Sequence, residues 1–200
     1  MGLTIMILGL VLFLGAHTLT TRRAARASLV ASMGEGGYKI AYSLVSIAGI
    51  ALIAYGFSVY RAAGYIDVWE GSVSPGVLGG LKHTTVALML PASILLVAAY
   101  LRGRIYTAVK HPMLTAVKLW AAGHLLANGD LGSIILFGSF LAWAVYDRIS
   151  LKSRSDAGAP PIPVGGVTND VLAVVIGVVV YVALVFAFHP VVIGVPVVGT

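Results

Sequence analysis

The sequence has no cysteine among its 200 residues, and only 10% of its residues carry a charge. Without a thiol, the chain cannot form a disulfide, an iron–sulfur cluster, a thiolate metal site or a cysteine nucleophile. Soluble globular domains are about a quarter charged, whereas this chain is 59% hydrophobic. A soluble fold could not bury so much apolar surface, so the sequence predicts a protein whose solvent is a lipid bilayer.

Negative charge is also scarce, with 7 Asp and Glu against 13 Lys and Arg. The excess cations do not form a continuous basic stripe, because they occur in short clusters between long apolar runs. The positive-inside rule produces this pattern in membrane proteins. The net charge therefore indicates membrane topology, and we expect no nucleic-acid partner.

Apolar segments recur along the chain at about the length of a membrane-spanning helix, which needs about 20 residues. The predicted spans are about Leu3–Thr21, Ile40–Tyr60, Thr84–Leu101, Met113–Ala127, Leu131–Tyr146 and Val171–Phe188. The fourth and fifth are the shortest and flank the polar turn Asn128–Asp130, which predicts a short helical hairpin. The predicted fold class is therefore all-α, a polytopic membrane bundle of about six transmembrane helices, in a single domain over residues 1–200.

The loops between these segments alternate in charge, which predicts their topology. The first, third and fifth loops hold Arg22, Arg23, Arg26, Lys39, Arg102, Arg104, Lys110, Arg148, Lys152 and Arg154. The second and fourth loops hold Arg61 and Lys82 as their cations, offset by Asp67, Glu70 and Asp130. The N-terminal run is apolar before its arginines, which is the reverse of a signal peptide. We therefore expect a multi-pass protein with both termini on the outer side.

Two polar stretches next to these segments carry structural predictions. Gly34-Glu35-Gly36-Gly37 has no following Lys-Ser/Thr, so it is not a phosphate loop, and we expect a flexible loop there. Thr168-Asn169-Asp170 precedes the last apolar segment and predicts its helix N-cap.

Ionisable side chains inside apolar segments are the main functional signal, because lipid tolerates them poorly. His17 lies inside the first segment and His124 inside the fourth. Two neutral imidazoles facing each other across a helix bundle are suitable axial ligands for haem iron, and Arg22, Arg23 and Arg26 would lie near the haem propionates. The alternative is that each histidine hydrogen-bonds a backbone carbonyl or a nearby hydroxyl as a core residue.

The other histidines and the small residues have simpler interpretations. His83, His111 and His189 lie at the ends of apolar segments, where we expect anchoring at the membrane interface. Small residues in the fifth segment allow close helix approach, and they permit an oligomer without requiring one. They are Gly132, Gly138, Ser139 and Ala142.

Several stretches together resemble the NnrU family of bacterial polytopic membrane proteins, which is named for an association with nitrite and nitric oxide reduction. The matching stretches are the His17–Arg23 end of the first segment, Gly37-Tyr38 leading into Ser43–Ser46, the block Lys110–Ser150, and His189-Pro190 followed by Gly194. The resemblance implies a place in the bacterial inner membrane and a role in denitrification. In that membrane, the outer termini predicted from the loop charges would be periplasmic.

The family's plant relative, 15-cis-zeta-carotene isomerase, is a haem b membrane enzyme, and the resemblance implies haem b as a cofactor here. Its haem-ligating histidines lie in the first matching helix and in a Trp-x-x-Ala-His stretch. The similar positions in this chain are His17 and His124, the latter within Trp120–His124. The isomerase also has a cysteine implicated in redox-dependent ligand switching. This chain has Ala121 at the similar position, so a cysteine-to-histidine ligand switch is excluded.

Three hypotheses of function follow from the sequence. The first is a haem b membrane protein of the NnrU type that serves nitrogen-oxide respiration. The second is a haem-dependent cis–trans isomerase of a carotenoid or another hydrophobic isoprenoid lipid. The third is a cofactor-free scaffold that partners respiratory membrane proteins during complex assembly, with its histidines as core residues.

Overall fold

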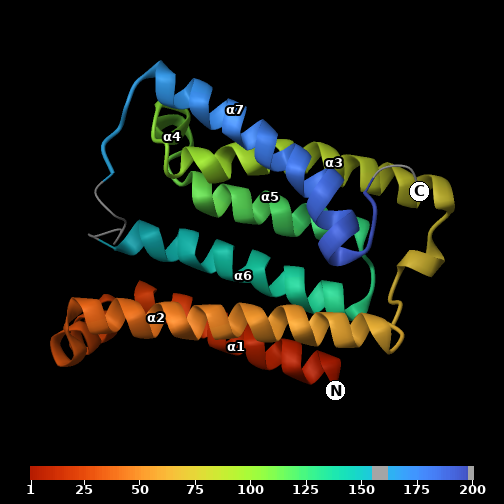
Figure 1. The fold of residues 1–200 in the computed structure, drawn as a ribbon, viewed down its shortest axis with the longest axis horizontal. Helices are drawn as coiled ribbons and strands as arrows, with labels where there is room; N and C mark the ends of the chain where they lie inside the picture. The colour runs from red at the N-terminus through yellow and green to blue at the C-terminus, as the bar shows by residue number, and fades with distance from the viewer. Residues whose placement is uncertain (155–161, 198–200) are drawn as a thin grey trace. The chain divides into compact units, whose positions relative to one another are not determined.

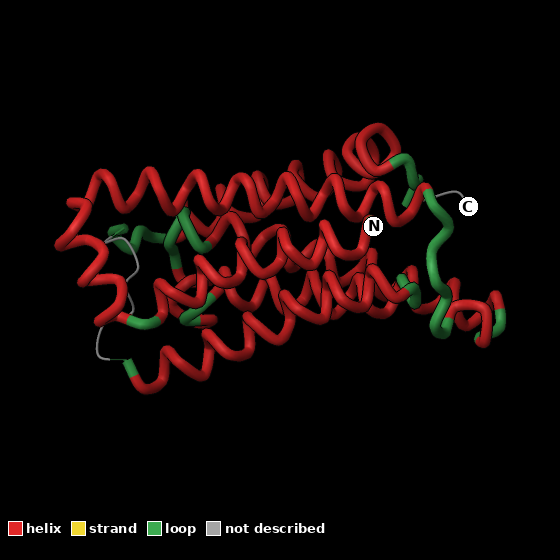
Figure 2. The backbone as a smooth tube through the Cα atoms, turned by 90° about the horizontal axis from the view of Figure 1, so that it is seen from below, coloured by secondary structure: helices red, strands yellow, loops and turns green. Residues whose placement is uncertain are grey.

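The structure is a computed structural model that describes residues 1–154 and 162–197. Over these residues it consists of helices joined by loops and has no strand (Figure 2). The elements are α1 (Gly2–Thr21), α2 (Arg23–Ala62), η1 (Glu70–Ser72), α3 (Pro75–Ala98), α4 (Arg104–Val109), α5 (Pro112–Ala127), α6 (Leu131–Ser153), α7 (Val167–Ala183) and η2 (Leu184–Ile193). The predicted all-α fold class is confirmed.

Five helical segments in the described part of the chain are long and apolar enough to cross a membrane. They are α1, α2, α3, α6 and the continuous run of α7 with η2. The remaining predicted span corresponds to α5, which at 16 residues is the short arm before the Asn128–Asp130 turn. The second arm, α6, is longer than predicted and reaches Ser153. Lys152 in its last turn is favourable beside the negative end of the helix dipole.

The expectation of a flexible loop at Gly34–Gly37 is wrong. Helix α2 runs from Arg23 to Ala62, and the residue with non-helical dihedrals inside it is Gly34, at φ 73° and ψ 161°. Glycine adopts this backbone conformation without a steric penalty from a Cβ atom. The helix resumes at once, and the Lys39 ammonium lies 2.8 Å from the Glu35 carboxylate one turn earlier. The glycines therefore produce a kink and not a loop.

The chain divides into two compact units. The first contains Met1–Ser72 and Asn128–Ser150, and the second contains Val73–Ala127 and Leu151–Thr200. Helices α1, α2 and most of α6 belong to the first unit, and α3, α4, α5, α7 and η2 belong to the second. We describe each unit by itself, and the predicted single domain stays a prediction.

Glycines hold α1 against the second part of α2 in the first unit (Figure 1). Gly2 meets Gly56, and Gly9 meets Gly49, so the two helices run antiparallel with seven residues between successive contacts. A Cβ atom on Gly9 would lie 2.6 Å from the backbone nitrogen of Ile53, and one on Gly49 would lie 2.9 Å from the Cβ of Phe13. Small residues of this kind let backbones approach closely in membrane proteins.

In the second unit, α3 packs against both α5 and α7. The Thr85 hydroxyl donates to the Gly123 carbonyl of α5 at 2.6 Å. A Cβ atom on Gly177 of α7 would lie 2.6 Å from the Cα of Ile94. A hydrogen bond therefore joins α3 to α5, and a close glycine contact joins α3 to α7.

The predicted N-cap of the last helix is wrong. Helix α7 begins at Val167, its N-cap is Gly166, and no side chain caps it. The Asp170 carboxylate instead accepts from the backbone N–H of Arg104 at 3.0 Å and of Ile105 at 2.9 Å, so it caps α4. The Asn169 amide donates to the Arg102 carbonyl at 2.9 Å. Asp170 therefore caps a helix distant in sequence and not its own, and Asn169 bonds the chain just before that helix.

Candidate functional site

His17 lies among aromatic rings in the first unit. Its ring stacks on Phe13 with centroids 4.1 Å apart and meets Trp143 of α6 edge-on at 5.6 Å. The ring of Tyr42 lies 5.3 Å away. The Nδ1 atom is 2.7 Å from the Phe13 carbonyl oxygen, four residues earlier. A proton held on Nδ1 by that carbonyl places the imidazole lone pair on Nε2, the nitrogen that can bind a metal.

The three predicted arginines lie where α1 meets α2. Arg22 separates the two helices, and Arg23 begins α2. Arg22 lines a cavity of about 350 Å³ together with Trp143, which also contacts His17. The Arg26 guanidinium lies 5.3 Å from the centre of the Tyr38 ring. The fold therefore brings these cations to the end of α1 that carries His17, as the sequence order requires.

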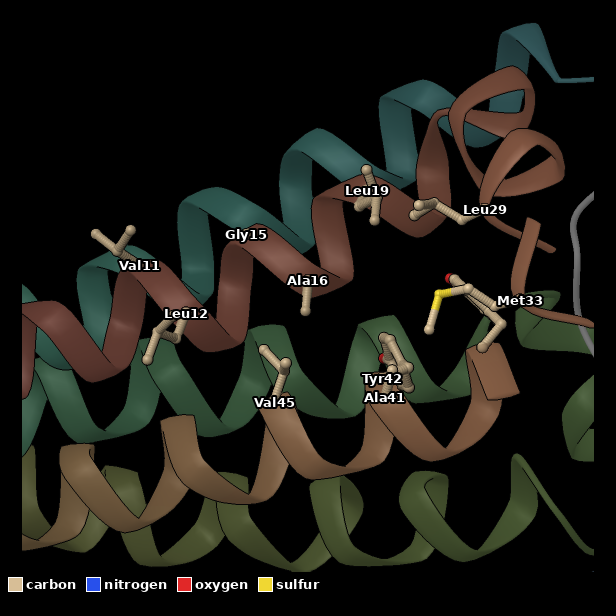
Figure 3. A pocket seen from close by; sticks show the side chains of 11 residues that line it. Val11, Leu12, Gly15, Ala16, Leu19, Leu29, Met33, Ala41, Tyr42 and Val45 are labelled. Atoms are coloured by element: carbon tan, nitrogen blue, oxygen red, sulfur yellow. The ribbon is translucent and has the colours of Figure 1, made fainter. Parts of the chain in front are cut away.

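A second cavity in this unit, of about 420 Å³, lies between α1 and α2 (Figure 3). Leu12 and Ala16 of α1 point toward Tyr42 and Val45 of α2. His17 is not among the lining residues, but it contacts the lining residue Tyr42. This cavity is therefore an apolar space beside the histidine and not around it.

His124 lies in the second unit, on α5. Its Nδ1 atom is 2.8 Å from the Trp120 carbonyl oxygen, and its ring lies 5.4 Å from the Trp120 ring. The ring of His189 lies 6.3 Å away, with the two planes 21° apart. His17 and His124 belong to different units, so the predicted pairing of these two side chains stays a prediction.

A segment of π-helix places His189. Its Nδ1 atom is 2.8 Å from the Leu184 carbonyl oxygen, five residues earlier, which is the spacing of a π-helix. Pro190 follows within the segment and has no N–H to donate. π-Helical turns are rare and occur frequently at functional sites. The prediction of simple interfacial anchoring did not foresee that His189 faces His124.

The Asn128–Asp130 turn forms a polar cluster in the first unit, where Asp130 caps α6 as its place in the turn predicts, while its ion partner was not foreseen. Asp130 is fully buried, and its carboxylate accepts from the Ser133 N–H at 3.0 Å and from the Arg61 guanidinium at 3.2 Å. The loop before α3 pairs with the turn, since the Val68 N–H donates to the Gly129 carbonyl at 2.9 Å. Two features of the sequence could have indicated this cluster. One is an Asp three residues before a Ser at the start of an apolar run, and the other is Arg61 in a loop poor in cations.

These contacts limit the chemistry that the chain can perform. In the part of the chain that the structure describes, no group of three or more His, Cys, Asp or Glu side chains could hold a metal ion. The expectation that each membrane histidine bonds a backbone carbonyl is met at Nδ1 of both His17 and His124.

The comparisons with known proteins agree with the resemblance seen in the sequence. The family model described as NnrU protein matches residues 5–197, which is nearly the whole chain. No curated protein and no solved structure matches the chain. With its apolar helices and this extended match, the chain belongs to the NnrU protein family.

Proposed function

We propose that this NnrU protein binds haem b through His17 and His124 and serves nitrite and nitric oxide reduction in the bacterial inner membrane. The observation that carries the proposal is the same for both residues. A backbone carbonyl holds Nδ1 at 2.7 Å in His17 and at 2.8 Å in His124. This contact favours the tautomer with its lone pair on Nε2 and restrains the ring, as in other histidine ligands of metals.

Haem fits this donor set better than a metal ion alone. A porphyrin would bring its own nitrogen ligands, so His17 and His124 would need to supply only the remaining ones. The rings of Phe13, Tyr42 and Trp143 around His17 provide the apolar surroundings that a macrocycle requires. Of the predicted arginines, Arg22 shares a cavity with Trp143, which contacts His17, so Arg22 would neutralise a propionate. When bound, haem b would supply one-electron redox chemistry.

His189 is a second candidate for the ligand that pairs with His124. The two rings lie 6.3 Å apart within one unit and are nearly parallel. Backbone carbonyls hold Nδ1 at 2.8 Å in both residues. A ligand search should therefore include His189 beside the pair proposed from the sequence.

The test is haem content in four single variants, each with histidine replaced by alanine, at positions 17, 124, 189 and 83. His83 is the matched control, because its Nδ1 also lies 2.7 Å from a carbonyl four residues earlier, yet it is exposed. We expect His17→Ala and His124→Ala to lose haem and His83→Ala to keep it. Pyridine haemochrome absorbance per mole of protein measures this.

The outcomes of this series separate the candidates. If His124→Ala and His189→Ala lose haem while His17→Ala keeps it, then His189 and not His17 is the ligand that pairs with His124. Full haem content in all four variants would contradict histidine ligation. A protein that contains no haem and takes up none would favour the scaffold hypothesis.

A further inference from the structure

The larger cavity of the first unit is open to its surroundings on one side. Its wall is formed by α1, the first turns of α2 up to Met33, and the part of α2 after Gly34 (Figure 3). All its lining residues are apolar apart from the hydroxyls of Tyr38 and Tyr42. Val11 is 64% exposed and Met33 is 48% exposed. In a membrane protein such an opening faces lipid chains, because no water fills the hydrocarbon core.

The hydroxyl of Tyr38 is the polar group that this cavity leaves unsatisfied. Tyr38 lines the cavity and is only 6% exposed. Among the described residues, its hydroxyl has no hydrogen-bond partner. A buried hydroxyl without a partner costs free energy, so native structures pair nearly all of them. The unpaired donor therefore points to an acceptor that a bound molecule would bring.

A positive charge lies over the ring that carries this hydroxyl. The Arg26 guanidinium lies 5.3 Å from the centre of the Tyr38 ring. The same stretch carries Arg22, Arg23 and Lys39, with Glu35 as its acid, and Glu35 is paired with Lys39 at 2.8 Å. The stretch that carries Tyr38 therefore has an excess of cations and an unpaired donor, which together suit an anion.

We propose that this cavity binds one anionic phospholipid of the surrounding membrane. An acyl chain occupies the apolar wall of Leu12, Ala16 and Val45, and the phosphate accepts from Tyr38 and pairs with Arg26. Basic residues next to a membrane segment attract anionic lipids at the cytoplasmic surface, where the charge pattern places this cluster. No histidine lines the cavity, so haem would find no axial ligand in its wall, and the inference does not depend on haem binding.

The test is native mass spectrometry of detergent-purified protein after exchange into phosphatidylglycerol or phosphatidylcholine, counting the lipids retained. The variants are Tyr38→Phe, Arg26→Gln, and Ala16→Trp, which fills the cavity. Tyr55→Phe and Lys82→Gln are matched controls, because both side chains are exposed and neither lines the cavity. Elution as a single symmetric peak shows that each variant is folded.

We expect wild-type protein to retain one phosphatidylglycerol in preference to phosphatidylcholine. Tyr38→Phe and Arg26→Gln should each weaken that retention by about tenfold, the effect of losing one hydrogen bond to a charged group. Ala16→Trp should abolish retention, and the controls should match wild type. Equal retention of the two lipids, or wild-type retention in both Tyr38→Phe and Arg26→Gln, would overturn the proposal. Release of haem from Ala16→Trp, with the same lipid retention as wild type, would also overturn it.

Discussion

At the scale of single residues, burial distinguishes side chains that look equivalent in the sequence. Asp130 and Glu35 are both acids next to glycine, and each is paired with a cation. Asp130 is fully buried and caps α6, whereas the Glu35 side chain is 64% exposed. A buried carboxylate that loses its partners, or a buried cap that is removed, costs far more than an exposed ion pair.

Replacing Asp130 by alanine should therefore destabilise the protein strongly. The variant loses the cap of α6 and leaves the Arg61 guanidinium without this carboxylate, which together cost about 2–4 kcal/mol. Glu35→Gln is the control, and it should leave the thermal midpoint unchanged within error. Thermal unfolding in detergent, followed by circular dichroism, measures both. Equal midpoints for Asp130→Ala and Glu35→Gln would contradict a structural role for the buried pair.

Sequence reasoning at this scale found the membrane histidines but missed contacts between segments distant in the chain. His17 and His124 are visible because a single ionisable residue in an apolar run is unusual. Asp130 is visible as a cap of the turn, but its ion partner is not, because that contact joins segments distant in the chain. Asp130 contacts Arg61, which lies 69 residues earlier, and no local pattern predicts such a contact.

At the scale of elements, close backbone approach decides how helices pair. The sequence drew attention to the small residues of α6, and a Cβ atom on Gly132 would collide with the ring of Tyr60 on α2, whereas one on Gly138 would meet nothing within 4 Å. Further tight contacts, which the sequence reasoning did not single out, lie between α1 and α2, at Gly2, Gly9, Gly49 and Gly56. Their seven-residue spacing was present in the sequence. The choice of partner helix was not, because it depends on the reversal of the chain at Arg22 and Gly34.

Replacing Gly9 by valine should separate α1 from α2. The new side chain would meet the backbone of Ile53, which cannot move as a flexible side chain can, so we expect a loss of about 1–3 kcal/mol. Gly15→Val on the same helix is the matched control, because a Cβ atom there meets nothing within 4 Å. Denaturant titration of both variants in mixed micelles measures the difference. Equal stability of the two would show that these glycines do not set the packing.

At the scale of the whole molecule, family membership is established, and five helical segments of the described chain are long and apolar enough to cross a membrane. The all-α class was predictable because apolar runs of this length leave few alternatives in a bilayer. The orientation across the membrane stays a prediction from the loop charges. It implies that the Arg22–Arg26 cluster lies in the cytoplasm and that the loop after α2 lies outside.

The absence of cysteine makes this orientation directly testable. Ser28→Cys and Ala63→Cys introduce single thiols at exposed positions on opposite predicted sides. A membrane-impermeant maleimide added to whole cells should label Ala63→Cys and should reach Ser28→Cys only after lysis, because the charged reagent cannot cross lipid. Labelling of Ser28→Cys in intact cells, with Ala63→Cys protected, would reverse the predicted topology.

The central claim is that the protein carries haem b, and the most direct measurement is an absorption spectrum of the detergent-purified protein. It should be recorded oxidised, dithionite-reduced, and after addition of haemin. We predict a strong Soret band, with sharp α and β bands on reduction, because two imidazoles give six-coordinate iron. A colourless protein that also takes up no added haemin would contradict the claim.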